Sequence, residues 1–164
     1  MFYPSFTKNT VKDHVNFDTL SSDGTHVTVA TIVEHQSRFL MVEEKRDGRI
    51  VLNQPAGHLE ANETLLQAAT RETLEETGWH VELQTVIGIY LFQAANGETY
   101  QRVCFSAKPT SHDADRPLDE GIIRARWMTQ DEIVDNSAQL RSYLVADCIR
   151  DYLNKPHYSL DLIR

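Results

Sequence analysis

Residues 57–79 read GHLEANETLLQAATRETLEETGW and carry glycine, glutamate and arginine at fixed offsets in one short segment. Within it, Thr64 is followed three residues later by Gln67, the pattern of a capping box at the start of a helix. Gly78 can adopt the left-handed conformation that ends a helix. The segment therefore predicts a helix over about residues 65–77.

Three glutamates share one face of this expected helix. At about 100° per residue, Glu72 and Glu76 lie nearly one above the other, and Glu75 lies beside them. Like charges this close repel each other unless a cation neutralises them. Carboxylate oxygens favour a hard cation, so the pattern predicts a Mg²⁺ site in which Mn²⁺ can substitute. Because Mg²⁺ held by carboxylates keeps positions for water and substrate phosphates, the chemistry indicated is phosphoanhydride hydrolysis.

A solvated acidic helix face is the ordinary alternative, since most glutamate-rich helical stretches are simply soluble. That alternative does not explain why Gly57 stands six residues before Glu63, or why Arg71 immediately precedes the acidic cluster. The spacing of these residues favours a metal site over a merely soluble helix.

The segment resembles the signature of the Nudix hydrolases, G-x5-E-x7-R-E-U-x-E-E-x-G-U, in which U is a bulky apolar residue. Every glycine and charged position matches, whereas Thr73 and Trp79 stand at the two U positions, which are packing positions. The resemblance implies an α/β Nudix fold, with a mixed β-sheet between helices and the signature as a loop, a helix and a loop. The implied metal ligands are Glu72, Glu75, Glu76 and the backbone carbonyl of Gly57. Arg71 and Glu63 would form the ion pair that braces the loop against the helix.

Two further stretches extend the resemblance beyond the signature. NQPAGHLE at residues 53–60 and LRSYLVADCIRDY at residues 140–152 look like the NudJ-type branch, a group of small bacterial Nudix phosphatases. With the signature included, this similarity covers about residues 26–164. It implies release of inorganic phosphate from nucleoside tri- and diphosphates, and action on the pyrophosphate ester of the thiamine pyrimidine precursor.

Three other functions stay open on the sequence. A dinucleotide or ADP-ribose pyrophosphatase would give a nucleoside monophosphate among its products, and a non-catalytic nucleotide-binding module would bind without turnover. An RNA-end processing enzyme needs a basic surface, which a formal net charge of −8 does not favour. The expected partners are therefore small nucleotide or pyrophosphate substrates, with no nucleic acid and no membrane. The chain is expected to be a monomer or a weak homodimer.

Proton-transfer and substrate-binding residues are predicted from their positions. Some Nudix enzymes draw an extra ligand or base from a loop before the last strand, where this chain has Asp119 and Glu120. Glu120 is the candidate base, and His112 is expected in the same loop region. The candidates for substrate binding are Gln54, His58 and Arg102, although basic side chains such as the last two are as often surface charges.

Length and composition indicate one compact domain. The 164 residues, with a hydrophobic content of 41%, suffice for a sizeable core. Residues 1–24 are polar and aperiodic and are expected to form an N-terminal extension, with the hydrolase domain over residues 25–164. No apolar run approaches a membrane span or a secretory signal, so a cytoplasmic location is expected. Cys104 and Cys148 are expected to be buried reduced thiols.

Strand composition recurs on both sides of the expected helix. Strands are predicted at residues 27–33, 39–44, 50–54, 81–93, 99–107 and about 122–128. Asn96-Gly97 gives the strongest hairpin signal in the chain. Thr129 and Glu132 predict a second capping box, and apolar residues at helical spacing predict a final helix over residues 140–152. These elements agree with a mixed sheet between helices.

Overall fold

The computed structural model describes residues 24–94 and 97–164. Almost all of the expected N-terminal extension, residues 1–24, lies outside these residues, as does Asn96 of the expected hairpin turn. The strands are β1 (Thr25–His35), β2 (Arg38–Arg46), β3 (Arg49–Asn53), β4 (Ala56–His58), β5 (Trp79–Gln93), β6 (Thr99–His112) and β7 (Ile122–Met128). The helices are α1 (Leu65–Thr77), α2 (Gln130–Asp135) and α3 (Tyr143–Asn154), with short 3-10 turns η2 (Ser137–Gln139) and η3 (Leu160–Leu162). Among the described residues, no helix has the length and apolar character that a membrane crossing needs.

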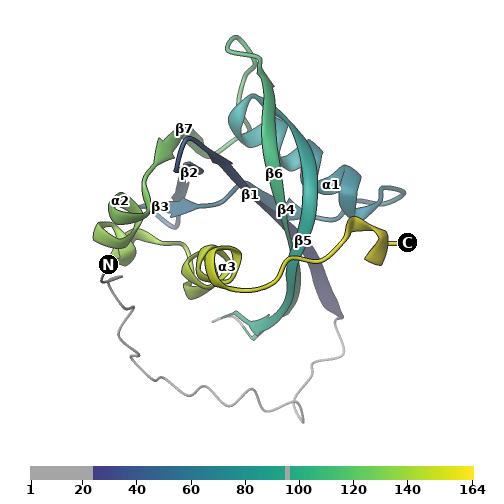
Figure 1. The fold of residues 1–164 in the computed structure, drawn as a ribbon. Coiled ribbons are helices and arrows are strands. Elements are labelled where there is room, and N and C mark those ends of the chain that lie inside the picture. Colours follow the sequence, from purple (N-terminus) through teal and green to yellow (C-terminus); the bar gives the residue numbers. More distant parts are fainter. Residues whose placement is uncertain (1–23, 95–96) are drawn as a thin grey trace.

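The strands form a mixed sheet between helices, as the sequence predicts. The strand order is β3-β2-β1-β6-β5, while β4 pairs with β1 and β7 pairs with β2. β1 and β6 run parallel, and the other pairings are antiparallel. Helices α1 and α3 lie on opposite faces of the sheet (Figure 1). The protein is therefore an α/β protein in which α1 and α3 cover the two faces.

Alternate residues of β6 contribute to two separate cores. Val103 and Phe105 belong to the cluster that contains Ala68 and Ala69 of α1. Cys104 belongs to the cluster on the other face, which contains Val145, Cys148 and Ile149 of α3. Successive side chains of a strand point to opposite faces, so one core forms on each side of the sheet. Both cysteines are buried and free, as predicted.

β5 and β6 are longer than predicted. Their pairing continues to Trp79↔His112, with register shifts that interrupt the regular ladder and let two long strands bend. The placement of His112 in the following loop is therefore wrong, because His112 is the last residue of β6. The sequence predicts that this strand ends at Ala107, because Pro109 interrupts the strand composition. In the structure β6 continues to His112, although its pairing with β1 ends at Ala107. A proline is tolerated there because the strand has lost one neighbour.

β4 and the start of α3 also differ from the prediction. The sequence does not predict β4, because this strand has only three residues, follows Pro55 and contains Gly57. β4 nevertheless pairs with β1. α3 begins at Tyr143 and not at residue 140, because Leu140 forms an isolated bridge with Leu52 of β3. The chain therefore leaves η2 in an extended conformation that joins the edge of the sheet before the helix begins.

Candidate active site

α1 begins and ends at the residues that the capping pattern predicts. The Thr64 hydroxyl accepts a hydrogen bond from the Gln67 N–H, and the Gln67 side chain accepts one from the Thr64 N–H. Gly78 has a φ of 70°, and its N–H donates to the Leu74 carbonyl. A Cβ at Gly78 would be strained and would also crowd the Asp113 carbonyl. Gly78 thus fixes the end of the helix against the loop that follows β6.

Three carboxylates meet beside α1. Glu72, Glu75 and Asp119 each offer an oxygen atom, and these atoms lie within 4.8 Å of one another. Asp119 comes from the loop between β6 and β7, and its backbone N–H donates to the Glu75 carbonyl at 3.1 Å. Sequence reasoning gave a role only to the neighbouring Glu120, which is exposed and is not a member of this group. In the sequence, Asp119 and Glu120 before β7 indicate an acidic contribution from this loop. Which of the two carboxylates meets α1 is decided by the backbone path of the loop.

Glu76 is buried between α1 and the start of β4. Its carboxylate accepts a hydrogen bond of 2.8 Å from the Ala56 N–H, and 8% of the residue is exposed. Burial raises the pKa of Glu76 to about 8; the Ala56 hydrogen bond opposes this rise, and the charges of Glu72 and Glu44 add to it. Burial also raises the pKa of Glu72. In the absence of a cation, Glu76 therefore holds a proton at neutral pH.

Gly57 lies in β4 against the Glu72 side chain. It pairs with Val29 of β1, and a Cβ at this position would overlap the Glu72 carboxylate. Only glycine lets the backbone approach a carboxylate this closely. This contact accounts for a glycine at position 57. Ligation of a metal by the Gly57 carbonyl stays a prediction.

Arg71 joins the loop before α1 to the acidic cluster. Its Nε and Nη2 donate to the two Glu63 oxygens at 3.0 and 2.7 Å, so the ion pair is bidentate. Its Nη1 donates to Glu72 at 2.8 Å and to Glu75 at 2.9 Å, and Nη2 also donates to the His58 carbonyl at 3.0 Å. Hydrogen bonding to Arg71 lowers the pKa of Glu63, and the carboxylates in turn raise the pKa of Arg71. Arg71 therefore braces the loop and also offsets the repulsion within the cluster.

The three candidates for substrate binding lie at different depths. His58 is exposed and directly follows Gly57. Gln54 is buried, and its Nε2 donates to the Val145 carbonyl at 2.8 Å, so its side chain ties the start of β4 to α3. Arg102 has 6% of its surface exposed, which corrects the alternative that it is a surface charge. Their roles in substrate binding stay predictions.

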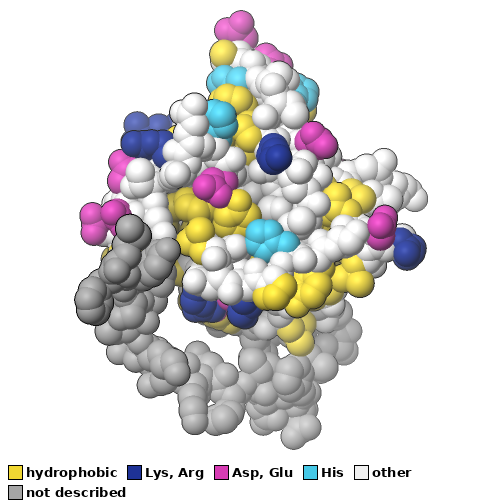
Figure 2. All heavy atoms as spheres, viewed as in Figure 1, with side chains coloured by type: hydrophobic (Ala, Val, Ile, Leu, Met, Phe, Trp, Pro, Cys, Tyr) yellow, Lys and Arg dark blue, Asp and Glu magenta, His cyan; other side chains and the backbone are white. Residues whose placement is uncertain are grey.

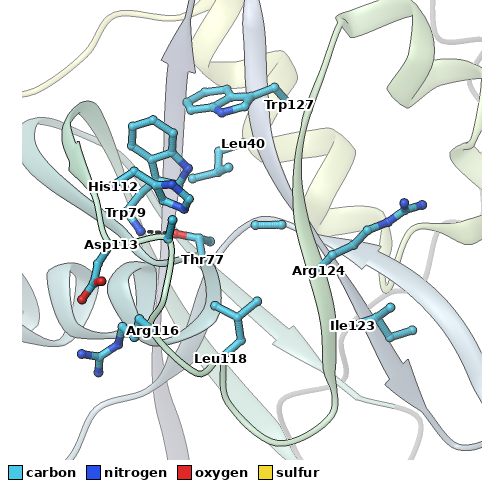
Figure 3. A pocket seen from close by; sticks show the side chains of 12 residues that line it. Leu40, Thr77, Trp79, His112, Asp113, Arg116, Leu118, Ile123, Arg124 and Trp127 are labelled. Atoms are coloured by element: carbon cyan, nitrogen blue, oxygen red, sulfur yellow. Dashed lines mark hydrogen bonds between the residues drawn. The ribbon is translucent and has the colours of Figure 1, made fainter.

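A cavity of about 400 Å³ lies next to the end of α1. Trp79 and Trp127 meet at 81° in its wall, with ring centroids 5.5 Å apart, and His112 stacks on Trp79 at 4.6 Å. Figure 3 shows Leu118, from the loop after β6, on one side of the cavity and β7 on the other. Leu118 immediately precedes Asp119, so one loop forms a wall of the cavity and supplies a carboxylate to the cluster.

The basic side chains are dispersed on the face drawn in Figure 2. There, the lysines and arginines of the described residues lie in small separate groups, with acidic side chains near several of them. They form no continuous basic stripe on this face, in contrast to proteins that follow the phosphates of a nucleic acid. The net charge of −8 agrees with this distribution.

Comparison with known proteins places this site in a family. A model described as the NUDIX domain matches residues 24–148, which include the whole of residues 57–79. Phosphatase NudJ of Escherichia coli (strain K12) is 41% identical over 138 residues, which cover 84% of this chain and 90% of that protein.

Solved structures agree with this match. A NUDIX hydrolase from Nitrosomonas europaea superposes with a TM-score of 0.84 at 46% identity, covering 86% of this chain and 97% of that one. An Ap4A hydrolase from C. elegans, at 18% identity and a TM-score of 0.61, covers 78% of this chain and 95% of that one and shows the shared fold alone. The chain therefore belongs to the Nudix hydrolases and is an enzyme that acts on phosphoanhydride bonds.

Proposed function

We propose that this Nudix hydrolase is a Mg²⁺-dependent phosphatase that releases inorganic phosphate from nucleoside tri- and diphosphates, with Mn²⁺ able to substitute. The observation that carries the proposal is the meeting of Glu72, Glu75 and Asp119 within 4.8 Å, with buried Glu76 on the same helix. The similarity to a phosphatase over most of the chain supports release of phosphate over other cleavages. The pyrophosphate ester of the thiamine pyrimidine precursor belongs to the same proposal as a second substrate.

The donor set fits Mg²⁺. The three clustered side chains offer only hard carboxylate oxygens, which this ion prefers, and their mutual repulsion favours a cation between them. Glu72, Glu75 and Asp119 would hold the ion, with Glu76 and the Gly57 carbonyl completing the site. When bound, Mg²⁺ would polarise the phosphoryl group and lower the pKa of a nearby water.

Arg71 would keep this site in order. Its Nη1 occupies one oxygen of Glu72 and one of Glu75, which leaves the second oxygen of each carboxylate available to a cation. The bidentate pair with Glu63 holds the guanidinium in place when the cation arrives. The arrangement would therefore be preorganised to accept a divalent cation.

Glu76 would supply a proton acceptor. Burial holds its proton at neutral pH, and a cation beside it would favour the charged form and release that proton. Glu76 could then accept a proton from the attacking water, while Glu120, on the loop beside Asp119, is the alternative base. The two candidate bases differ in solvent exposure, since Glu76 is buried and Glu120 is exposed.

Phosphorus NMR of the reaction products tests the proposal. Purified protein would be incubated with Mg²⁺ and a panel of nucleoside tri- and diphosphates, ADP-ribose, a dinucleoside polyphosphate and the thiamine pyrimidine pyrophosphate. The proposal predicts inorganic phosphate as the first product from the triphosphates, and none after chelation of the metal. Nucleoside monophosphate with pyrophosphate would contradict the phosphatase assignment, and binding without turnover would contradict the enzyme assignment.

A further inference from the structure

Arg141 comes from a segment outside the Nudix signature, and its backbone is fixed to the edge of the sheet. Leu140 forms an isolated bridge with Leu52 of β3, and the Arg141 N–H donates to the Leu52 carbonyl at 2.8 Å. Leu52 in turn pairs with Glu43 of β2. The position of Arg141 is therefore set by two neighbouring strands before α3 begins at Tyr143.

A buried carboxylate holds the Arg141 side chain. The Arg141 Nη1 donates to Glu44 of β2 at 2.9 Å. The Glu44 side chain is 8% exposed, whereas 28% of the Arg141 side chain is exposed. A buried carboxylate is costly without a cation beside it, so this ion pair is not an interchangeable surface contact. Glu44 therefore keeps the guanidinium of Arg141 in a defined place.

This ion pair lies within electrostatic reach of the acidic cluster. The pKa of Glu76 is raised chiefly by burial; the charge of Glu44 adds to this rise, and the charge of Arg141 opposes it. Burial is also the largest cause of the lowered pKa of His58, and the charge of Arg141 lowers it further. Glu76 accepts from Ala56, the first residue of β4, and His58 is the last. Arg141 therefore lies near the strand that borders the cluster.

Arg141 differs from Arg71 in the donors that it has left. Arg71 uses all three of its nitrogen atoms on carboxylates of the signature and on one backbone carbonyl. For Arg141, Nη1 alone has a hydrogen-bond partner within residues 24–94 and 97–164, so Nε and Nη2 are unused there. A partly exposed guanidinium with two unused nitrogens matches the geometry of a phosphate, which accepts paired hydrogen bonds.

We infer that Arg141 binds the phosphate chain of the substrate, with Nε and Nη2 donating to phosphate oxygens while Glu44 holds the guanidinium. This inference rests on the proposed function and adds a substrate contact to it. Three carboxylates around one Mg²⁺ leave no net positive charge for a di- or triphosphate, and Arg71 is occupied by the same carboxylates. Arg141 supplies the missing charge. Arg141 is thus a substrate-binding residue, and Glu44 is a positioning residue.

Binding of an α,β-methylene nucleoside diphosphate in Mg²⁺ tests this contact, because the bridging carbon prevents release of phosphate. For Arg141→Met we expect a Kd that calorimetry finds roughly 10- to 100-fold higher, since charge-assisted hydrogen bonds are lost. Mn²⁺ alone, titrated by electron paramagnetic resonance, should bind no more weakly than to wild type, because Arg141 does not bond the clustered carboxylates. Arg38→Met is the matched control, since Arg38 is a surface arginine paired with Glu132 at 3.2 Å.

A double variant separates phosphate binding from a purely structural role. If Arg141 only neutralises Glu44, then adding Glu44→Gln to Arg141→Met should restore both the melting temperature and the binding of the analogue. We expect the melting temperature to recover while the Kd of the analogue stays roughly 10-fold above wild type. The double variant keeps the net charge of the protein, so this remaining loss reports the hydrogen bonds of Arg141.

Four results would each overturn the inference. They are an unchanged Kd of the analogue in Arg141→Met, an equal loss in Arg38→Met, weaker binding of Mn²⁺ by Arg141→Met, and full recovery of analogue binding in the double variant. The last result would leave Arg141 with the structural role alone. Absence of phosphate release by the wild type would instead contradict the proposed function, because the binding comparison requires no turnover.

Discussion

The Glu76 carboxylate accepts a hydrogen bond of 2.8 Å from the backbone N–H of Ala56, and this contact joins the helix of the acidic cluster to the start of β4. It places a buried acid one residue from Gly57, whose backbone lies against Glu72. The two ends of the Nudix signature are therefore held together by groups that also belong to the proposed site. The structural and the catalytic role of Glu76 can be separated only by substitutions that keep its hydrogen bond with Ala56.

Glu76→Gln is such a change. The amide oxygen of glutamine can still accept from Ala56, but the side chain can no longer carry charge or accept a proton. We expect kcat to fall by at least about 100-fold while the protein stays folded. Steady-state phosphate release, with circular dichroism as the folding control, checks this. Near-wild-type turnover by a folded variant would remove Glu76 from the proposed chemistry.

The metal-free protein should lose stability as the pH rises from about 4.5 to 8. The folded pKa of Glu76 is about 8 against an ordinary value of 4.5, so the folded state binds a proton that the unfolded state releases in this window. The raised pKa of Glu72 acts in the same direction. Glu76→Gln lacks the larger effect and should melt at least about 4 °C above wild type at pH 8, with little difference at pH 4.5. Thermal scans in a chelator measure this, and an equal pH dependence in both proteins would contradict it.

Arg71→Ala and Glu75→Gln should affect the protein differently. Arg71 bonds Glu63, Glu72 and Glu75, so its removal leaves partly buried carboxylates without a partner and should lower both stability and activity. Glu75→Gln relieves repulsion in the metal-free cluster, so its melting temperature should stay equal or rise while activity falls. Melting temperatures measured without metal decide between these roles. Equal destabilisation of the two variants would show that the division is wrong.

Asp119→Asn and Glu120→Gln form a matched pair of neighbours. Asp119 offers an oxygen to the cluster and Glu120 does not, so only the Asp119 variant should need more Mg²⁺. We expect its half-saturating Mg²⁺ concentration to rise about 10-fold or more. Metal titrations of activity provide the comparison, and an unchanged requirement in Asp119→Asn would exclude this residue from the site. A loss of kcat in Glu120→Gln without a change in Mg²⁺ requirement would support Glu120 as the base.

The sequence predicted the helix of the site closely because its signals are local. The Thr64 capping box and the left-handed Gly78 act within a few residues, and both occur as predicted. Thr73 also fits a position where the family has a bulky apolar residue. It is fully buried, and its hydroxyl donates to the Ala69 carbonyl at 2.7 Å, so its polar group is satisfied within the helix.

The remaining features depend on contacts between distant residues. Asp119 meets Glu75 only because the loop after β6 crosses the helix, and no local pattern distinguishes it from Glu120. The burial of Arg102 follows from its place between β1 and β5, whereas its sequence neighbourhood fits an exposed charge equally well. Sheet order and loop paths determine both, and periodicity within a segment carries no information about them.

Hydrolysis of a nucleoside triphosphate in ¹⁸O-labelled water with Mg²⁺ tests the central claim most directly. If the water attacks the terminal phosphorus, mass spectrometry will find the label in inorganic phosphate, and nucleoside diphosphate will appear before monophosphate. Attack at the inner phosphorus would place the label in nucleoside monophosphate and release unlabelled pyrophosphate. We predict label in inorganic phosphate; label mainly in the monophosphate would contradict the phosphatase assignment and make the protein a pyrophosphohydrolase.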